Sequence, residues 1–409
     1  MNTPKIRFKG FADDWEQRKL GEIYGSIGNA FVGTATPYYV DQGHFYLESN
    51  NVKDGQINHN SEIFINDEFY EKQRDKWLHA GDMVMVQSGH VGHAAVIPKE
   101  LDNTAAHALI MFRNAKEKIE PYFLNYEYQT DKTKKKIENI TTGNTIKHIL
   151  ASDMQEFEVD IPKYEEQKII AGYFRTIDHL ITLHQCKCDE TKELKKFMLQ
   201  KMFPKNGEKN PEIRFEGFTD DWEQRKLSDC AEFRRGSFPQ PYGNKDWYDG
   251  KGAMPFVQVA DVSSDMKLVN DTKQKISKLA QPMSVFAEKG SVLVTLQGSI
   301  GRVAITQYGA FVDRTVLIFD KYKDDIDKKF WAYIIKEKFE YEAKKAPGGT
   351  IKTITKEVLA NFDLMLPCYA EQSILADYLI KLDHLITLHQ RKCEKLKELK
   401  KFMLQNMFV

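Results

Sequence analysis

The sequence predicts an α/β protein built as a pseudo-two-fold tandem repeat, in which two α/β bodies alternate with two long helices that form an antiparallel coiled coil. Three observations predict it. Long segments occur twice, each half contains an apolar run ending in regularly placed glycines, and each half closes on a segment with a seven-residue apolar period. We expect bodies at 1–160 and 213–365, helical regions at 161–203 and 366–409, and a linker at 204–212.

The repeat is clearest at the start of each half. Ile6–Leu20 and Ile213–Leu227 differ at only two positions and lie 207 residues apart. A second match pairs Ile161–Phe203 with Leu366–Phe408 at a separation of 205 residues. The near-constant separation means that the whole chain consists of two like units. Between them, the polar stretch Pro204–Asn210 contains Pro and Gly, which is typical of a linker.

Within each body we expect a strand, a tight glycine turn and a second strand. Gly81–Ala95 aligns with Gly290–Ala304, with the glycines in the same places after an apolar stretch typical of a buried strand. Glycine allows the positive φ and close backbone approach that such a turn needs. A later match pairs Gly143–Lys147 with Gly349–Lys352, in each half after a lysine-containing segment with helical character.

The closing segment of each half predicts a long helix. Apolar residues recur every seven positions, with further ones three positions later, which favours a coiled-coil seam about five heptads long. At 1.5 Å per residue each helix is a rod of roughly 50 Å, and pseudo-two-fold symmetry would make the two antiparallel. His184 and His389, with Lys187 and Lys392, would form a polar layer that fixes register. The predicted seam residues are Ile170, Ile177, Leu180, Leu194, Met198, Leu375, Leu382, Leu385, Leu399 and Met403.

Composition bears on partners and compartment. The chain has Lys+Arg 59 and Asp+Glu 59, and this neutrality at first argues against a nucleic-acid partner. The balance averages over unlike regions, however, because Lys187–Lys201 and Arg391–Lys401 are basic whereas Glu62–Glu71 is acidic, so DNA is not excluded. A mean hydropathy of −0.52, a start without a signal-peptide pattern and five sparse cysteines predict a cytoplasmic protein without a membrane span.

The sequence lacks the motifs of several catalytic sites. It contains no Pro-Pro pair of the amino-methyltransferase type, no Gly-x4-Gly-Lys-[Ser/Thr] loop for ATP and no Gly-x-Ser-x-Gly. Cys186 and Cys188 follow His184, but Arg391 replaces the first cysteine in the second half and no further cluster completes four ligands. We therefore expect no catalytic residue, metal or cofactor in this chain.

The two glycine turns are candidates for reading base edges in DNA. Their frame is constant while their donors and acceptors differ, as readers of different groove patterns require. The alternative interpretation is an ordinary polar hairpin turn. The turn residues are Ser88, His90 and His93 in the first half, and Gln297, Ser299 and Arg302 in the second.

Basic and polar residues later in each half are candidates for phosphate contacts, which would set position rather than sequence. The alternative is a solvated helix face. The candidates follow Lys132 in the first half and have counterparts in the second: Lys134, Lys135, Lys136, Asn144, Thr145, Lys147, His148, Lys344, Lys345, Thr350 and Lys352. Weaker candidates of the same kind are His107, Arg234, Arg235 and Arg314.

The copied segments also carry two tryptophans, Trp15 and Trp222. One interpretation makes them core anchors at the entry to each body. The other makes them a docking surface, in which case the partner would be present twice or would touch both halves alike.

Taken together, these motifs resemble the specificity subunit of type I restriction–modification enzymes over essentially the whole chain. The resemblance rests on the Trp-x3-Lys-Leu entries, the glycine-rich strand turns, and the sequence that opens each long helix. That sequence is Ile161-Pro162…Glu166-Gln167…Ile169, repeated as Leu366-Pro367…Glu371-Gln372…Ile374.

The resemblance implies two target-recognition domains, each reading one half of a bipartite, asymmetric DNA sequence, with the paired helices setting the gap. It implies a non-catalytic subunit that docks two methyltransferase subunits, which use S-adenosylmethionine to methylate adenine. It also implies that two ATP- and Mg-dependent restriction subunits join this complex in the endonuclease form. Glu166, Gln167, Glu371 and Gln372 then become docking candidates beside the tryptophans. The rival interpretations are a stand-alone DNA-binding protein and a coiled-coil scaffold without methyltransferase partners.

Overall fold

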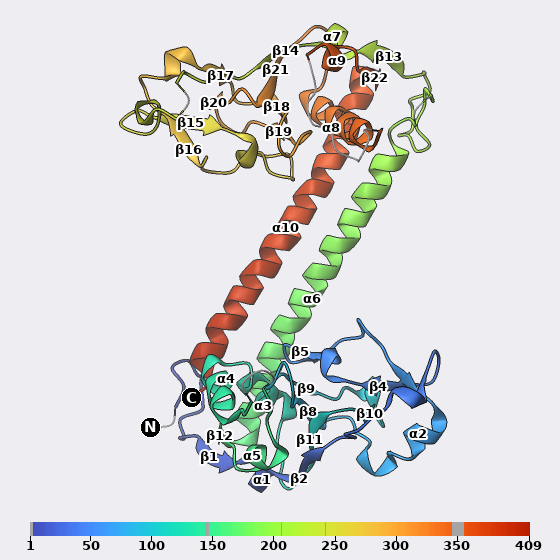
Figure 1. Ribbon diagram of the computed structural model, residues 1–409, viewed down its shortest axis with the longest axis vertical. Helices are drawn as coiled ribbons and strands as arrows, with labels where there is room; N and C mark the ends of the chain where they lie inside the picture. The colour runs from blue at the N-terminus through green and yellow to red at the C-terminus, as the bar shows by residue number, and fades with distance from the viewer. Residues whose placement is uncertain (1–2, 144–146, 206, 242, 346–355) are drawn as a thin grey trace. The chain divides into compact units, whose positions relative to one another are not determined.

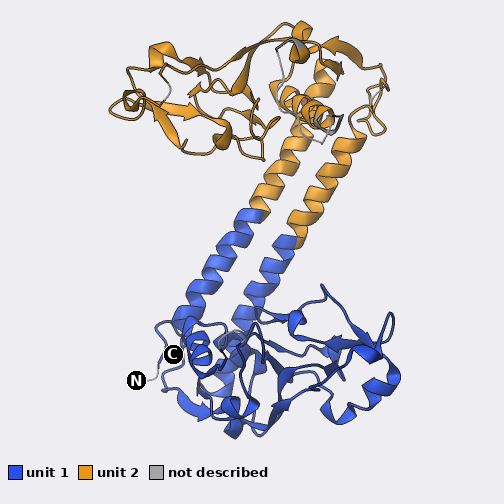
Figure 2. Ribbon diagram, viewed as in Figure 1, with its two compact units in different colours: residues 1–185, 390–409 blue, residues 186–389 orange. Residues whose placement is uncertain are grey.

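The computed structural model describes residues 3–143, 147–205, 207–241, 243–345 and 356–409, without the side chains of 343–345 and 356–357. The chain divides into two compact units, Met1–Gln185 with Gln390–Val409, and Cys186–His389 (Figure 2). Each unit contains one α/β body together with parts of both long helices, α6 (Tyr164–Lys201) and α10 (Tyr369–Met407) (Figure 1).

The first body holds two four-stranded sheets, ordered β2-β11-β8-β9 and β10-β4-β7-β3, and the strand pairs β1-β12 and β5-β6. Its strands are β1 (Glu16–Lys19), β2 (Tyr24–Asn29), β3 (Tyr39–Val40), β4 (His44–Leu47), β5 (Val52–Lys53), β6 (Gln56–Ile57), β7 (Phe64–Ile65), β8 (Met83–Val86), β9 (Ala94–Val96), β10 (Ala105–Ala106), β11 (Leu109–Ala115) and β12 (Glu158–Ile161). Its helices are α1 (Leu20–Ile23), α2 (Asp67–Glu71), α3 (Pro121–Glu127), α4 (Asp131–Ile140) and α5 (Ala151–Gln155).

The second body repeats this plan with sheets ordered β14-β21-β18-β19 and β16-β15-β20-β17 and the pair β13-β22. Its strands are β13 (Glu223–Lys226), β14 (Ala231–Arg235), β15 (Met254–Val257), β16 (Gln274–Ile276), β17 (Val285–Ala287), β18 (Val292–Thr295), β19 (Val303–Ile305), β20 (Ala310–Val312), β21 (Val316–Tyr322) and β22 (Asp363–Leu366). Its helices are α7 (Leu227–Cys230), α8 (Lys328–Lys345) and α9 (Lys356–Ala360).

The predicted strand–turn–strand is confirmed in both bodies, as β8–β9 and β18–β19. Gly92 and Gly301 have φ of 87° and 79°, in the region that favours glycine. A Cβ on Gly92 would lie 2.9 Å from Cγ2 of Ile137 in α4, and one on Gly301 would lie 2.9 Å from Cβ of Phe339 in α8. The glycine is therefore needed twice over, for the turn itself and for the helix that packs on it.

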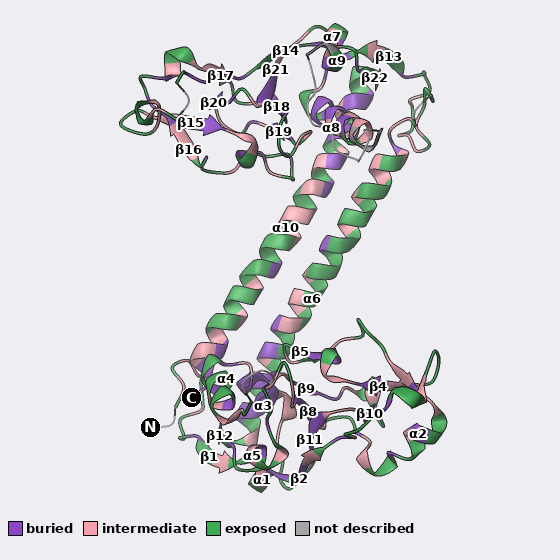
Figure 3. Ribbon diagram, viewed as in Figure 1, coloured by how far each residue is buried: buried purple, intermediate pink, exposed green. Residues whose placement is uncertain are grey.

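The two long helices are also confirmed, and they pair antiparallel within each unit. In the first unit the Cys393 thiol lies 4.0 Å from the Ile181 carbonyl, and in the second the Cys188 thiol lies 3.9 Å from the Ile386 carbonyl. Large parts of both helices remain exposed (Figure 3). No helix among the described residues is long and apolar enough to cross a membrane.

The seam of this coiled coil differs from the predicted one. Its members are buried or half-buried and alternate steps of four and three residues: Ile170, Phe174, Ile177, Ile181, His184, Cys188, Thr191, Lys195, Met198 and Met202 in α6, and Leu375, Leu379, Leu382, Ile386, His389, Cys393, Leu396, Lys400, Met403 and Met407 in α10. The second predicted set, which lies three residues after each seven-residue position, is not in the seam. Leu194, Leu385 and Leu399 are each 41% exposed, Lys187 and Lys392 are exposed, and Leu180 is half-buried beside the seam. Some seam positions carry polar side chains instead, so a prediction based on apolar character alone put this second set of seam residues in the wrong place.

The end of each long helix completes the core of the body encoded by the other repeat. Met407 and Phe408, at the end of α10, are buried in the core of the first body. Met202, at the end of α6, is buried in the core of the second body, and Phe203 packs against it. Each unit is therefore assembled from both halves of the sequence.

Candidate nucleic-acid interface

The copied segments contact one another, and this contact fixes the frame that carries the turns. Arg7, from the first copied entry, donates two hydrogen bonds of 2.7 and 2.8 Å to the carboxylate of Glu166 at the start of α6. Arg214 and Glu371 form the same bidentate pair at 2.7 and 2.7 Å in the second unit. Planar guanidinium–carboxylate pairs of this kind combine charge with fixed geometry.

Burial corrects the predicted docking residues. The six predicted side chains are each at most 3% exposed: Trp15, Glu166, Gln167, Trp222, Glu371 and Gln372. Trp15 packs edge-on against Phe123 at 5.5 Å, and Trp222 packs against Phe330 at 6.0 Å. The glutamine carbonyls accept backbone N–H groups from the bodies. The core-anchor interpretation therefore accounts for the copied residues, because side chains this buried offer no surface to a partner.

A triad of polar side chains ties the first body to both long helices. Lys400 of α10 lies 2.7 Å from the Asp178 carboxylate of α6, and the Tyr126 hydroxyl of α3 donates to the same carboxylate at 2.8 Å. The Lys400 and Asp178 side chains are only 14% and 15% exposed. Burial, with Asp178 beside the ring, raises the pKa of Tyr126, so the hydroxyl remains a donor.

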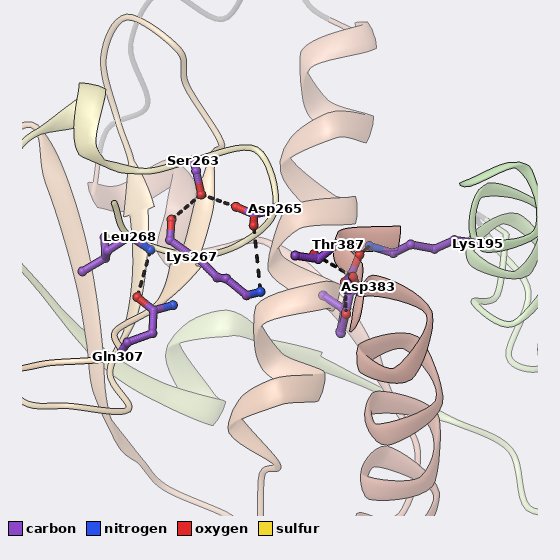
Figure 4. A network of polar contacts seen from close by, with 9 residues as sticks. Lys195, Ser263, Asp265, Lys267, Leu268, Gln307, Asp383 and Thr387 are labelled. Atoms are coloured by element: carbon purple, nitrogen blue, oxygen red, sulfur yellow. Dashed lines mark hydrogen bonds and ion pairs between the residues drawn. The ribbon is translucent and has the colours of Figure 1, made fainter. Parts of the chain in front are cut away.

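The second unit repeats this triad with the roles of the helices exchanged. Lys195 now comes from α6, and its ammonium lies 2.6 Å from the Asp383 carboxylate of α10 (Figure 4). The Tyr333 hydroxyl of α8 donates to the same carboxylate at 2.5 Å. In each triad the lysine and the aspartate come from different repeats, which local sequence patterns do not reveal.

The structure brings several predicted DNA-binding residues of the first body together. The Gly89 N–H donates to the Lys147 carbonyl at 3.2 Å, and Ser88 forms a β-bridge with His148. His90, His93, Lys134 and Lys147 line one hollow of about 720 Å³ beside the β8–β9 turn. The strand turn, α4 and the two residues Lys147 and His148 therefore form one surface.

His93 has a defined hydrogen-bonding role in this surface. Its Nδ1 accepts from the Asp54 N–H at 3.3 Å, and burial lowers the pKa of His93. A neutral ring whose Nδ1 accepts carries its proton on Nε2, where it can donate to an acceptor on a base edge. The His90 ring lies 6.3 Å away and is exposed. The first turn thus combines polar rings with lysines.

The lysine run on α4 is divided in its roles. Lys134 lines the hollow and Lys135 is exposed. Lys132 instead contacts the Asp160 carboxylate of β12 at 3.4 Å, and Lys136 donates to the Glu158 carbonyl at 3.3 Å. Only part of the run is therefore available for phosphate.

The turn of the second body presents a different set of groups. Gln297, Ser299 and Arg302 are all exposed. The Thr295 hydroxyl accepts from the Arg302 N–H at 3.0 Å and holds the turn closed, while the Arg302 guanidinium donates to the Val262 carbonyl at 3.3 Å. The same frame thus carries an amide, a hydroxyl and a guanidinium where the first body carries imidazoles.

Two of the weaker candidates contact other groups of the protein. His107 bridges the Glu48 carboxylate at 3.2 Å and the Gly33 carbonyl at 3.0 Å. Arg234 pairs with Asp320, with one hydrogen bond of 3.0 Å. The His107 and Arg234 side chains remain 25% and 48% exposed, so their contact with DNA stays a prediction.

The remaining candidates are either exposed or outside the described part of the chain. Arg235 and Arg314 are exposed. Asn144, Thr145, Thr350 and Lys352, with the side chains of Lys344 and Lys345, lie outside the described residues. Sequence reasoning also missed Lys397 and Lys401 of α10, which line the hollow of the first body.

Comparison with known proteins identifies what this frame resembles. The family model described as "Type I restriction modification DNA specificity domain" matches residues 12–193 and 219–398. Two Methanocaldococcus jannaschii proteins named as type I restriction enzyme specificity subunits, MjaX and MjaVIII, are 24% and 21% identical, over 98% and 95% of this chain and 94% and 91% of their own.

Solved structures share the fold. The S subunit of a type I restriction–modification system from M. genitalium superposes with a TM-score of 0.65 at 12% identity, covering 100% of this chain and 99% of that one. A chain from a study of type I R-M complex assembly gives a TM-score of 0.52 at 18% identity, covering 95% and 96%. With two matching domains over most of its length, the chain belongs to the specificity-subunit family of type I restriction–modification systems, whose part is recognition of the DNA target.

Proposed function

We propose that the two bodies read different halves of one bipartite, asymmetric DNA target. The observation that carries this is the pairing of a common frame with different turn side chains. The β8–β9 turn presents His90 and His93, whereas the β18–β19 turn presents Gln297, Ser299 and Arg302. Different donor and acceptor patterns match different base edges in the major groove. One chain would thereby specify two unrelated half-sites.

The coiled coil would set the spacer between the half-sites and dock the methyltransferase subunits. Its exposed apolar side chains support the docking role because they occur in equivalent positions of both helices: Leu183, Leu194 and Phe197 in α6, and Leu388, Leu399 and Phe402 in α10. Each unit then carries one leucine from one helix and a Leu–Phe pair from the other. Two equivalent apolar surfaces fit two copies of one partner.

Catalysis would lie in those partners. We expect two methyltransferase subunits to supply S-adenosylmethionine binding and adenine methylation, and two restriction subunits to supply ATP- and Mg-dependent cleavage. Among the described residues, no group of three or more His, Cys, Asp or Glu side chains is placed to hold a metal.

The test is exchange of one body in the assembled complex. The chain is co-expressed with its methyltransferase partner, and methylated adenines are mapped across the host genome. Replacing residues 21–160 with the corresponding segment of another family member should change one half-site and leave the other half-site and the spacer unchanged. The matched control replaces the corresponding segment of the second body, which should change the other half-site.

Other outcomes identify the rival functions. Joint movement of both half-sites would contradict the two-reader proposal. Sequence-specific binding by the purified chain, without co-purification of a methyltransferase, would indicate a stand-alone DNA-binding protein. A chain that neither co-purifies with a methyltransferase nor binds DNA in a sequence-dependent way would be a coiled-coil scaffold.

A further inference from the structure

The hollow beside the first glycine turn has a wall that comes from the second repeat. Besides the turn and α4, it is lined by Lys397, Lys400 and Lys401, from the last turns of α10. These residues belong to the same compact unit as the first body. The C-terminal helix therefore contributes side chains to the surface that carries His90 and His93.

Four lysines of this hollow have no ion pair within the described part of the chain. Lys134, Lys147, Lys397 and Lys401 make no ion pair or side-chain hydrogen bond with any described residue, whereas Lys400 is engaged by Asp178. The carboxylates in the lining are Asp54, Asp131 and Glu138, so five lysines face three acids. The hollow carries a positive excess in a chain whose formal net charge is zero.

The counterparts of Lys397 and Lys401 in α6 form ion pairs, although they lie in the same local sequence. Lys192 pairs with Asp189 at 3.0 Å and Lys196 pairs with Glu193 at 3.8 Å, each three residues back along the helix. Lys397 and Lys401 have acids at the equivalent positions, yet no such pair forms among the described residues. Lys397 and Lys401 instead line the hollow.

We propose that Lys397 and Lys401 bind backbone phosphates of the DNA whose bases the first turn reads, so that the C-terminal helix forms part of the first half-site interface. This rests on the proposed function and extends it to residues outside the recognition bodies. Lysine is a flexible point charge suited to phosphate, and phosphate contacts fix register and orientation without reading sequence. The helix that completes the first body's core would thereby also position the duplex against the turn.

The experiment measures salt dependence of DNA binding by the complex of the full chain with its methyltransferase partner. The Lys397→Gln/Lys401→Gln double variant is compared with wild type on a duplex carrying the methylated target found by genome mapping. Loss of two phosphate contacts should reduce the slope of log K against log salt by about 1.8. Between 50 and 200 mM salt, wild type should then lose about tenfold more affinity than the variant. The methylated sequence should stay the same.

The matched control is Lys192→Gln/Lys196→Gln, which removes the same charge from ion-paired copies and should leave the slope near that of wild type. An unchanged slope in the first variant, or an equal fall in both, would overturn the proposal. Loss of the methyltransferase from the first variant would also overturn it, because the lysines would then bind an acidic partner surface. If wild type itself fails to distinguish the target from a scrambled duplex, the proposed function fails rather than this extension.

Discussion

The Lys400–Asp178 pair offers a quantitative test of how the first body is held to the helices. We consider Asp178→Asn, Lys400→Gln and the double variant. Each single change leaves one charged side chain without its partner. That side chain is about 85% buried, since the two side chains are 15% and 14% exposed. Removing one member of a buried pair costs more than removing both, because the remaining charge keeps its desolvation penalty.

The magnitude follows from the geometry. At 2.7 Å the gross attraction is about 6 kcal/mol for an effective dielectric constant of about 20. Desolvation offsets much of this, so we expect each single variant to lose about 2–4 kcal/mol. The double variant should lose less than the sum of the two, with a coupling energy of about 2 kcal/mol.

The assay is urea unfolding of the full chain, monitored by tryptophan fluorescence. Wild type, the two single variants and the double variant are measured together as a double-mutant cycle. Lys195–Asp383 provides an internal replicate, because it repeats the geometry at 2.6 Å with 15% and 20% exposure. Lys192–Asp189 provides the exposed control at 44% and 55%, where we expect less than about 0.5 kcal/mol. A coupling at Lys400–Asp178 no larger than in the exposed pair would refute the assigned role of the triad.

Three further predictions concern the turn, a buried carboxyl and the spacer. Gly92→Ala should destabilise the chain by about 1–3 kcal/mol and more than Gly89→Ala, because both have positive φ but only Gly92 meets Ile137; thermal unfolding compares the two. Burial raises the pKa of Glu127 to about 8, so its folded form keeps a proton that the unfolded form loses. Stability should therefore fall between pH about 4.5 and 8, and Glu127→Gln should flatten this fall in urea titrations. Inserting one helical turn within Leu180–Met198 should lengthen the spacer without changing either half-site, as mapped by methylome sequencing.

The repeat made much of the fold predictable, because comparing the two halves of the sequence revealed which strands, turns and helices they share. The aligned glycines located β8–β9 and β18–β19, since only glycine suits the positive φ and the close helix contact at Gly92 and Gly301. The long helices followed from their period. These are local signals, and each depends on residues close together in the sequence.

The seven-residue apolar period was not sufficient to identify every residue of the coiled-coil seam. Leu194 and Leu399 have the chemistry of seam residues, yet Lys195 and Lys400 occupy the seam because aspartates on the facing helix satisfy them. The helices thus carry two apolar stripes, one for the seam and one exposed. Sequence alone does not tell which stripe meets the other helix, because both stripes are apolar and have the same period.

Internal contacts of two candidate site residues were missed for a related reason. His107 and Arg234 are basic residues near recognition elements, but their partners Glu48 and Asp320 lie 59 and 86 residues away in the sequence. Lys397 and Lys401 were overlooked because they belong to the other repeat. Both errors come from long-range contacts, which no local pattern contains.

The division between copied and divergent segments now has a physical basis. Copied residues meet copied residues: Arg7 meets Glu166, Arg214 meets Glu371, and the ends of the long helices enter the opposite cores. A change in any of them would need a matching change elsewhere in the frame. The exposed turn side chains His90, Ser299 and their neighbours carry no such constraint, because their frame is held by glycine and by backbone hydrogen bonds. This arrangement allows one turn surface to change without disturbing the other, which the proposed reading of two half-sites requires.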